Sequence, residues 1–206
     1  MPRLFAFGCS FTVGQGLPDI YPDVKHSNYA WPAVLGNMLG YEVVNNGVPG
    51  AGNAEIAANV FRTEFQEDDL CVILWSHFTR YDYFTYGDDL TGSKQWGRNE
   101  FSLMLGKEPI EEDWWKVHNR VKNWLAIQHV SLYLQSKNIR FSHMLGITEI
   151  YSYPKPALDI PNLIEGNHPH DFIIDRALDS KDHPPGHPGT GSQRLIAQIF
   201  YDRIDT

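Results

Sequence analysis

The chain has 206 residues, a formal net charge of −8 and a sequence pI near 5.5. That length suits one domain, and an apolar content of 42% is sufficient for a core. No basic run is present, so we expect no nucleic-acid partner, because binding a phosphate backbone needs clustered Lys and Arg. No apolar stretch reaches the length of a membrane span and no signal segment is recognised, so we expect a cytoplasmic or particle-associated protein without a membrane partner.

Strands and helices are predicted to alternate along the first half of the chain. Arg3–Phe7 is a short apolar run that ends at Gly8, as in a buried strand that enters a tight turn. The run at 70–75 lacks alternation, which indicates a strand covered on both faces. Between them we expect a polar loop at 14–28, a helix at 29–39 and a short strand at 42–44. A turn-rich loop at 45–53 and a second helix capped by Asn53 should follow.

The second half adds a long helix and a closing helix. Residues 80–110 mix aromatics with Gly, Asp and Ser, so we expect an irregular, aromatic-rich insertion near 80–112, either a lid or a surface loop. The longest helical pattern covers 113–137, and one side of it is expected to face the core: Trp114, Val117, Val121, Trp124, Leu125 and Gln128. We then expect a fourth strand at 139–145 and a Pro-rich irregular stretch at 151–170. A short helix or strand at 172–178 and the closing helix at 189–204 complete the chain.

This alternation is typical of an α/β fold. We expect a three-layer αβα sandwich around a flavodoxin-like, mostly parallel sheet of four or five strands, formed by 1–206 as a single domain. Cys9 and Cys71 lie on or beside predicted buried strands, which favours reduced core thiols over a disulfide. In such sheets the carboxyl ends of the strands share one edge, and ligands bind there.

Ser10 follows the first strand and is expected at that edge. It is a candidate nucleophile, with a helix N-cap as the alternative role. Serine attack needs a base, and Asp182, His183 and His187 precede the closing helix. A histidine there could accept the seryl proton while the aspartate orients the imidazole. Cys9, beside Ser10, is a lesser candidate because no motif that we recognise centres on it.

An oxyanion formed by serine attack needs hydrogen-bond donors that are already in place. The candidates are the backbone N–H of Ser10, the backbone N–H of Gly50 and the side-chain amide of Asn53. A glycine at position 50 also allows the backbone to approach a ligand closely.

Four segments, in this order, resemble the SGNH (GDSL-type) hydrolase family. They are residues 7–12 (FGCSFT), residues 46–53 (NGVPGAGN), the region after the third strand, and the Asp-His block before the last helix. The resemblance spans nearly the whole chain. It implies a serine hydrolase in which Ser10 is the nucleophile, the N–H of Gly50 is an oxyanion donor, and Asp182 and His187 complete a triad.

The third of these segments departs from the family pattern. The family usually has Gly-x-Asn-Asp there, with the Asn as an oxyanion donor, whereas residues 75–80 read WSHFTR. Ser76 or His77 could donate in its place, or Asn53 could do so alone. Arg80 could bind a substrate carboxylate or phosphate, or could be a structural ion-pair partner.

The last segment also departs from the pattern, which is usually Asp-x-x-His. The residue three positions before His187 is Pro184, and the nearest upstream aspartate is Asp182, which His183 directly follows. We prefer His187 as the base because it stands next to the final helix as in the family, with His183 as its competitor. If Asp182 does not reach His187, the site would be a Ser-His dyad, or would be weak or inactive.

The resemblance implies an ester substrate, since family members act as lipases, esterases, acyl-thioesterases and carbohydrate O-deacetylases. The aromatic-rich insertion favours a small-molecule or carbohydrate ester such as an acetylated sugar, and neither a cofactor nor a metal is implied. Two alternatives stay open. One is a catalytically weak or inactive module that binds with the same fold. The other is a metal-dependent hydrolase, with ligands from His168, His170, Asp171, Asp182, His183 and His187.

Overall fold

The structure is a computed structural model that describes residues 1–20, 25–78, 80–86, 94–100, 112–146, 160–164 and 187–204. The elements run β1 (Arg3–Gly8), α1 (Ser10–Val13), α2 (Trp31–Leu39), β2 (Glu42–Gly47), α3 (Asn53–Phe61), β3 (Leu70–Trp75), β4 (Arg80–Tyr86), β5 (Lys94–Glu100), α5 (Glu112–Ser136), β6 (Arg140–Leu145), β7 (Leu163–Ile164) and α6 (Thr190–Ile204).

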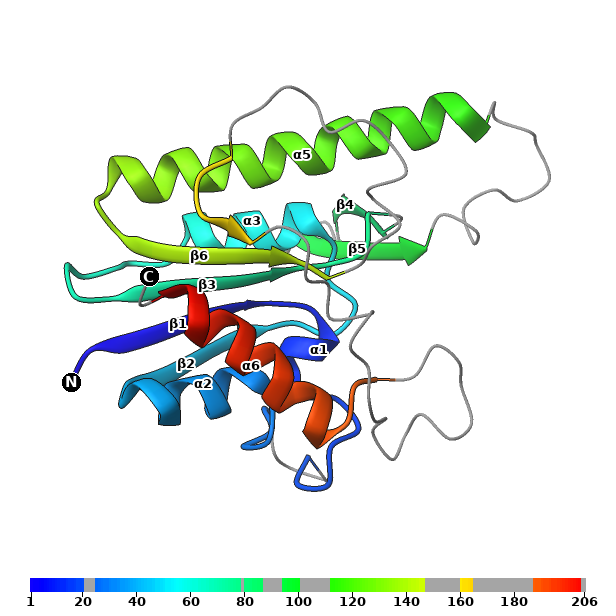
Figure 1. Ribbon diagram of the computed structural model, residues 1–206. Coiled ribbons are helices and arrows are strands. Elements are labelled where there is room, and N and C mark those ends of the chain that lie inside the picture. The colour runs from blue at the N-terminus through cyan, green and yellow to red at the C-terminus, as the bar shows by residue number, and fades with distance from the viewer. Residues whose placement is uncertain are drawn as a thin grey trace.

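A five-stranded parallel sheet forms the middle layer, in the order β2-β1-β3-β6-β7. Helices α3 and α5 cover one face of the sheet, and α2 and α6 cover the other (Figure 1). This arrangement confirms the expected αβα sandwich, and the strand order is that of flavodoxin-like sheets. The chain moves from β1 to one side for β2 and then returns to the other side for β3. The point between β1 and β3 is therefore the place where such sheets bind ligands.

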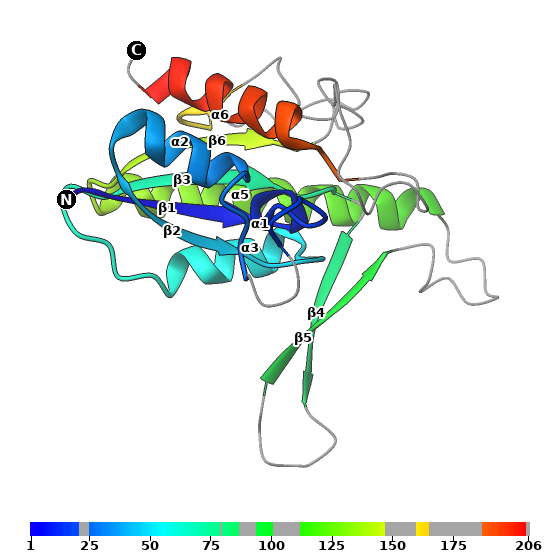
Figure 2. The same cartoon turned by 90° about the horizontal axis from the view of Figure 1, so that it is seen from below.

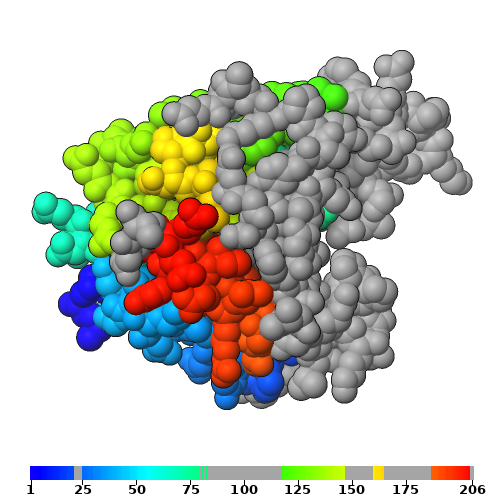
Figure 3. Space-filling model, in the orientation of Figure 1, coloured from blue at the N-terminus to red at the C-terminus, as the bar shows by residue number. Residues whose placement is uncertain are grey.

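Side chains of the central strands alternate between two apolar cores. Phe5, Phe7 and Ile73 pack toward α3 and α5, whereas Leu4 and Val72 pack toward α2 and α6. Helices α2 and α6 lie side by side over their face (Figure 3). Because both faces are covered, every residue of β3 is buried, which explains its unbroken apolar run.

The apolar side predicted for the long helix faces the core only in part. Trp124 is buried as expected, but Val117, Val121 and Leu125 are exposed. The buried side of α5 instead carries Asn119, Asn123, Ile127, Val130 and Leu134. The helix thus has two apolar sides, and periodicity alone does not say which one meets the sheet. Two asparagines lie inward because each donates a hydrogen bond to the carbonyl oxygen of Phe78.

The insertion expected to be irregular contains an antiparallel hairpin, so that expectation was wrong for 80–86 and 94–100. Strands β4 and β5 pair from Arg80 opposite Glu100 to Tyr86 opposite Lys94. The hairpin extends away from the rest of the molecule (Figure 2). Tyr, Phe and Thr give β4 a strand propensity that the surrounding Gly, Asp and Ser obscured.

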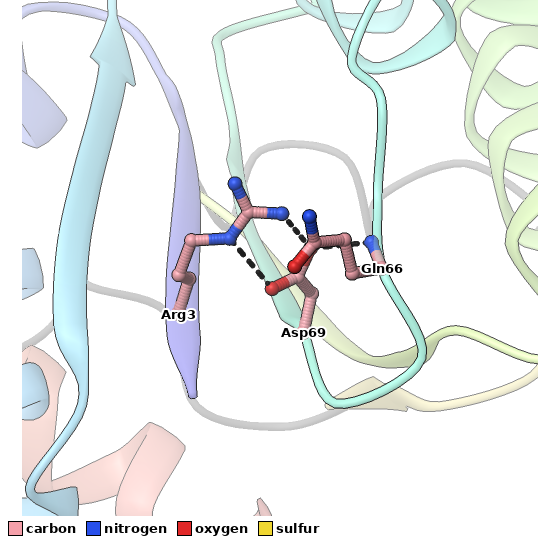
Figure 4. A network of polar contacts seen from close by, with 3 residues as sticks. All are labelled: Arg3, Gln66 and Asp69. Carbon is pink, nitrogen blue, oxygen red and sulfur yellow. Dashed lines mark hydrogen bonds and ion pairs between the residues drawn. The ribbon is translucent and has the colours of Figure 1, made fainter. Parts of the chain in front are cut away.

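An ion pair fastens the amino-terminal ends of the central strands (Figure 4). Arg3 donates from Nε and Nη2 to the two carboxylate oxygens of Asp69, at 2.9 and 2.6 Å, and the N–H of Gln66 also donates to Asp69 at 2.6 Å. Burial alone would raise the pKa of the Asp69 carboxyl, but these hydrogen bonds and the charge of Arg3 lower it. The pair ties β1 to the turn before β3 at the edge opposite Ser10.

Cys9 and Cys71 are both buried free thiols, which confirms the expectation from their positions. Burial raises the pKa of the Cys71 thiol well above its ordinary value. Within the part of the chain that the structure describes, no helix is both long enough and apolar enough to cross a membrane.

Candidate active site

Ser10 lies at the carboxyl end of β1, next to β3, where the chain reverses its direction across the sheet; this place is called the switch point. Gly8 of β1 is paired with Leu74 of β3, and Ser10 and Ser76 each stand two residues beyond that pair. Ser10 is the first residue of α1 and is only 4% exposed. The N-cap of α1 is Cys9, so the alternative that Ser10 caps this helix was wrong. Among the described residues the Ser10 hydroxyl has no hydrogen-bond partner.

Helix α1 has only four residues, and three other elements hold it in place. The Asn45 side chain donates to the carbonyl oxygen of Thr12 at 2.7 Å, and Trp31 Nε1 donates to the Thr12 hydroxyl at 3.3 Å. The Gln193 side chain, from α6, donates to the carbonyl oxygen of Phe11 at 3.1 Å. A Cβ at Gly8 would lie 2.1 Å from Thr12 Oγ1, so only glycine fits this turn. These contacts fix the position of Ser10.

The Gly50 loop lies beside the end of β1. The N–H of Val48 donates to the carbonyl oxygen of Gly8 at 3.0 Å, and the N–H of Ala51 donates to that of Val48 at 3.1 Å. Gly50 has a φ of 77°, in the left-handed region that favours glycine. Among the described residues the backbone N–H groups of Ser10 and Gly50 have no acceptor. Both therefore stay available to an oxyanion.

Asn53 clamps the backbone of Ser76. Its Oδ1 accepts the N–H of Ser76 at 2.7 Å, and its Nδ2 donates to the carbonyl oxygen of Ser76 at 3.2 Å and to Asn123 Oδ1 at 2.6 Å. The amide of Asn53 is thus fully engaged, and its place in the structure is that of a positioning group instead of the expected free donor. Asn53 was also expected to cap α3, but the N-cap is Gly52.

Arg80 connects the two loops that flank Ser10. Its Nη1 donates to the Ser76 hydroxyl at 2.9 Å and to the carbonyl oxygen of Ala51 at 3.1 Å. The Ser76 side chain is buried and accepts this hydrogen bond, so its own hydroxyl hydrogen can point to another acceptor. His77 is half-buried, and its carbonyl oxygen accepts the N–H of Arg80 at 3.1 Å.

Asp82 is a site residue that the sequence did not reveal. Its carboxylate accepts the N–H groups of Gly52 at 2.9 Å and Glu55 at 3.0 Å, at the amino-terminal end of α3. Burial raises the pKa of the Asp82 carboxyl, although these N–H groups oppose the shift. A Cβ at Gly52 would lie 2.4 Å from Asp82, so this loop again needs glycine. Asp82 lies in the segment that was expected to be irregular, and no local motif points to it.

A small polar cavity of about 30 Å³ adjoins this network. It is lined by Asn53, Ala54, Arg80, Asp82, Asn119, Lys122 and Asn123. A cavity of this size has room for ordered water but is far too small for an ester substrate.

His187 lies next to the helix that begins with Ser10. Its ring meets the ring of Phe11 edge to face, with centroids 5.9 Å apart. Gln193, one turn into α6, also accepts the N–H of Trp31 at 2.8 Å, which anchors the start of α6 beside α1. His187 and Ser10 are thereby brought to the same end of the sheet.

Several other candidates lie outside the described residues: His168, His170, Asp171, Asp182 and His183. Of the proposed metal ligands, only His187 is described. No group of three or more His, Cys, Asp or Glu side chains that could hold a metal ion occurs within the described ranges.

His143 is a buried titratable group away from Ser10, in the middle of β6. Its Nδ1 accepts Trp75 Nε1–H at 2.9 Å, and its Nε2–H donates to the carbonyl oxygen of Pro161 at 2.8 Å. Burial lowers the pKa of His143 to about 4. The ring is therefore neutral at physiological pH and joins β3 and β6 to the segment before β7.

No family model matches the chain, and no curated protein matches it. Solved structures do. One is a G-D-S-L family protein from Desulfitobacterium hafniense, at 16% identity and a TM-score of 0.54 over 98% of both chains. Another is a psychrotrophic esterase from Pseudoalteromonas, at 13% identity and a TM-score of 0.54 over 98% of this chain and 96% of that one. An acetyl xylan esterase from Butyrivibrio proteoclasticus has 13% identity and a TM-score of 0.53 over 99% of this chain and 64% of that one.

At these identities the likeness concerns the fold. It confirms the fold that the resemblance to SGNH hydrolases implied, across nearly the whole chain.

Proposed function

We propose that this chain is a carboxylic ester hydrolase with Ser10 as its nucleophile. The observation that carries the proposal is the placement of Ser10 at the switch point, on a helix whose next residue contacts the His187 ring. The esterases among the solved structures of this fold support the same reaction class.

In the proposed reaction, Ser10 Oγ attacks the carbonyl carbon of the ester while the His187 imidazole accepts the hydroxyl proton. The tetrahedral intermediate carries its negative charge on the former carbonyl oxygen, toward the N–H groups of Ser10 and Gly50. The C–O bond to the alcohol then breaks, and the alcohol leaves with the proton from His187. Water, deprotonated by His187, attacks the acyl-enzyme and releases the acid and Ser10. In this scheme Asp182 orients His187.

We assign the third oxyanion donor to the Ser76 hydroxyl, which takes the place of the missing asparagine. Arg80 donates to Ser76 Oγ at 2.9 Å, so the oxygen serves as an acceptor there and its hydrogen is left for the substrate. Asn53 holds the N–H and the carbonyl of Ser76, which fixes the backbone that carries the hydroxyl. Arg80 and Asn53 are positioning residues in this scheme, because they act through Ser76.

The substrate class that we propose is a small or carbohydrate ester with a short acyl group. The acetyl xylan esterase of the same fold supports an acetylated sugar. The alternative function is that of a catalytically inactive binding module. The segment after β3 favours it, because residues 75–80 lack the asparagine of the family pattern.

Labelling with a fluorophosphonate probe tests the proposal, because such probes react with activated serines. We expect the wild-type protein to be labelled and to cleave p-nitrophenyl acetate and acetylated xylan. Ser10→Ala should abolish both signals, and His187→Ala should lower turnover by at least about 100-fold, the usual range for a general base. Ser136→Ala, at an exposed serine at the end of α5, is the matched control and should keep full activity.

A folded wild-type protein that is neither labelled nor active on these esters would refute the hydrolase and favour the binding module. Labelling that survives Ser10→Ala would place the nucleophile elsewhere.

A further inference from the structure

A cavity of about 700 Å³ lies at the edge of the sheet opposite Ser10. It opens where β3 and β6 begin, at Leu70 and Arg140, and its other walls come from β7 and from the last turn of α6. The end of α6 and β7 lie side by side on this face of the molecule (Figure 3). Pockets for small molecules usually have roughly 300 to 1,000 Å³, so the cavity has the size of a ligand site.

The outer edge of β6 is only partly covered where it meets this cavity. Strand β7 pairs with His143 and Met144 alone, and the N–H of His143 donates to the carbonyl oxygen of Asn162 at 3.3 Å. Because alternate residues of a parallel strand turn their N–H and C=O to the same side, those of Phe141 also point to this edge. Among the described residues these two groups have no partner, although Phe141 is only 8% exposed.

Ser142 adds a buried hydroxyl to the lining of the cavity. The residue is 5% exposed, and strand alternation places it on the same side of β6 as Met144, toward α6. Within the part of the chain that the structure describes, its hydroxyl has no hydrogen-bond partner. A buried polar group without a partner costs free energy, so these groups call for an occupant that bonds to them. Water alone would satisfy them, but the rest of the lining selects for more than water.

The cavity is positively charged in a chain whose net charge is −8. Arg140 and Arg203 line it, and none of its described lining residues is acidic. Arg203 has an interaction of its own and offsets the partial negative charge at the end of α6, so the argument rests on Arg140. One N–H of Arg140 donates to the Tyr41 hydroxyl at 3.3 Å, and the other donors of its guanidinium have no partner among the described residues.

We propose that this cavity binds a small organic carboxylate with an apolar body, at a site separate from the candidate active site. The planar guanidinium of Arg140 matches a carboxylate and can hold it through two parallel hydrogen bonds. The Ser142 hydroxyl and the N–H of Phe141 can donate to its remaining lone pairs. The apolar body would lie against Leu70 and Ile164, which are buried side chains of the lining. An apolar wall with a few convergent polar groups is the usual form of a small-molecule site. This binding does not depend on the proposed reaction.

Titration of the ¹⁵N-labelled protein, followed by NMR, tests this inference. The probes are hexanoate and hexanamide, which share the apolar body and differ in charge. We expect hexanoate to shift the amide signals of Phe141, Ser142 and Ile204 in a saturable way, and hexanamide to bind at least tenfold more weakly. Arg140→Met should weaken hexanoate binding at least tenfold, and Arg140→Lys should lie between, because an ammonium keeps the charge but not the paired donors. Ser142→Ala should weaken binding several-fold without lowering the unfolding temperature, because the hydroxyl has no partner to lose.

Arg62→Met is the matched control, because Arg62 is also an exposed arginine but lies at the end of α3. This variant should bind hexanoate like the wild type. Ser10→Ala should do so too, which separates this site from the proposed reaction, whose product is also a carboxylate. Three outcomes would overturn the proposal: no saturable shift with hexanoate, equal binding of hexanamide, or full binding by Arg140→Met. Shifts confined to Gly50 and Ser76 would also overturn it, since the carboxylate would then bind at the candidate active site.

Discussion

Acidification from pH 7.5 to pH 5 should destabilise this protein through His143. The ring is fully buried and joins Trp75 Nε1–H to the carbonyl oxygen of Pro161, so it is held neutral between two strands and a loop. Protonation would put a charge in a site without solvent and would turn the acceptor Nδ1 into a donor facing the Trp75 N–H. The folded state therefore resists a proton that the unfolded chain accepts readily.

The size of the effect follows from the pKa. Burial lowers the pKa of His143 from 6.5 to about 4. Each tenfold change in proton affinity corresponds to about 1.4 kcal/mol, so at full effect the free energy of unfolding falls by roughly 3 kcal/mol. For a base with a lowered folded pKa, this stability is fully present above pH 6.5, decreases as the pH falls, and is lost below about pH 4. At pH 5 the loss should be roughly 2 kcal/mol.

The half-buried His26 also has a pKa that burial lowers, so it acts in the same direction as His143, whereas two carboxyl groups contribute with different windows or signs. The Asp69 carboxyl has a lowered pKa, so its contribution is present above its unfolded value and is lost in more strongly acidic solution. The raised pKa of Asp82 acts in the opposite direction, since the folded state gains stability as that carboxyl takes up its proton. A comparison of variants therefore isolates His143 better than the wild-type profile does.

Urea unfolding at pH 7.5, 6 and 5, followed by tryptophan fluorescence, provides the measurement. His143→Gln keeps one acceptor and one donor but does not titrate, so the difference between wild type and this variant should shrink by roughly 2 kcal/mol on going from pH 7.5 to pH 5. His129→Gln, at an exposed position on α5, is the control and should follow the wild type. The reasoning fails if the variant keeps the wild-type pH dependence, or if NMR gives His143 a pKa near 6.5.

Three further predictions concern the candidate site and the contacts that support it. Ser76→Ala should lower kcat by about 10- to 100-fold with little change in KM, as expected for the loss of one oxyanion donor at the lower end of the known range. Arg80→Met should have a similar or larger effect, because the carbonyl of Ala51 also loses its donor, and the two losses should be less than additive in the double variant; full additivity in this double-mutant cycle would refute the idea that Arg80 acts through Ser76. Gln193→Ala should destabilise the protein by about 1 to 3 kcal/mol, because the carbonyl of Phe11 and the N–H of Trp31 would stay buried without their partner. Urea unfolding checks this, with the exposed Gln198→Ala as control, and equal stability of the two variants would contradict it.

The layered fold could be predicted from the sequence because β1 and β3 carry apolar runs, β6 carries three apolar residues among six, and turn residues follow each of them. That pattern is local, and it identified β1, β3 and β6 with little error. The hairpin of β4 and β5 was missed because neither strand has a strict apolar-polar alternation, β5 is mostly polar, and both lie among polar residues. The orientation of α5 was misjudged because Asn119 and Asn123 look like surface residues until the carbonyl of Phe78 is placed beside them.

In the candidate site, too, some residues could be predicted from the sequence and others could not. Ser10, Gly50 and Ser76 could be named in advance, since each follows a strand and parallel strands end at one edge. The residues that hold them were not foreseeable. Asp82 reaches Gly52 across 30 positions, Asn123 reaches Asn53 across 70, and Gln193 reaches Phe11 across 182. Such pairs have no spacing that a sequence pattern could reveal, because packing alone brings them together.

If Ser76 takes the place of the family's asparagine, as we propose, the neighbouring residues must do more than they would beside an asparagine. An asparagine amide presents a donor whose direction is set by its planar group, whereas a serine hydrogen rotates freely and must be oriented from outside. In the proposed reaction Arg80 provides that orientation, because a guanidinium is always charged and can only donate. Its hydrogen bond occupies a lone pair of Ser76 Oγ and polarises the hydroxyl, which makes the hydroxyl a stronger donor. The clamp from Asn53 then fixes the backbone from which the hydroxyl extends. In this proposal, the departure from the family pattern after β3 is a transfer of the asparagine's role to Ser76, Arg80 and Asn53 acting together.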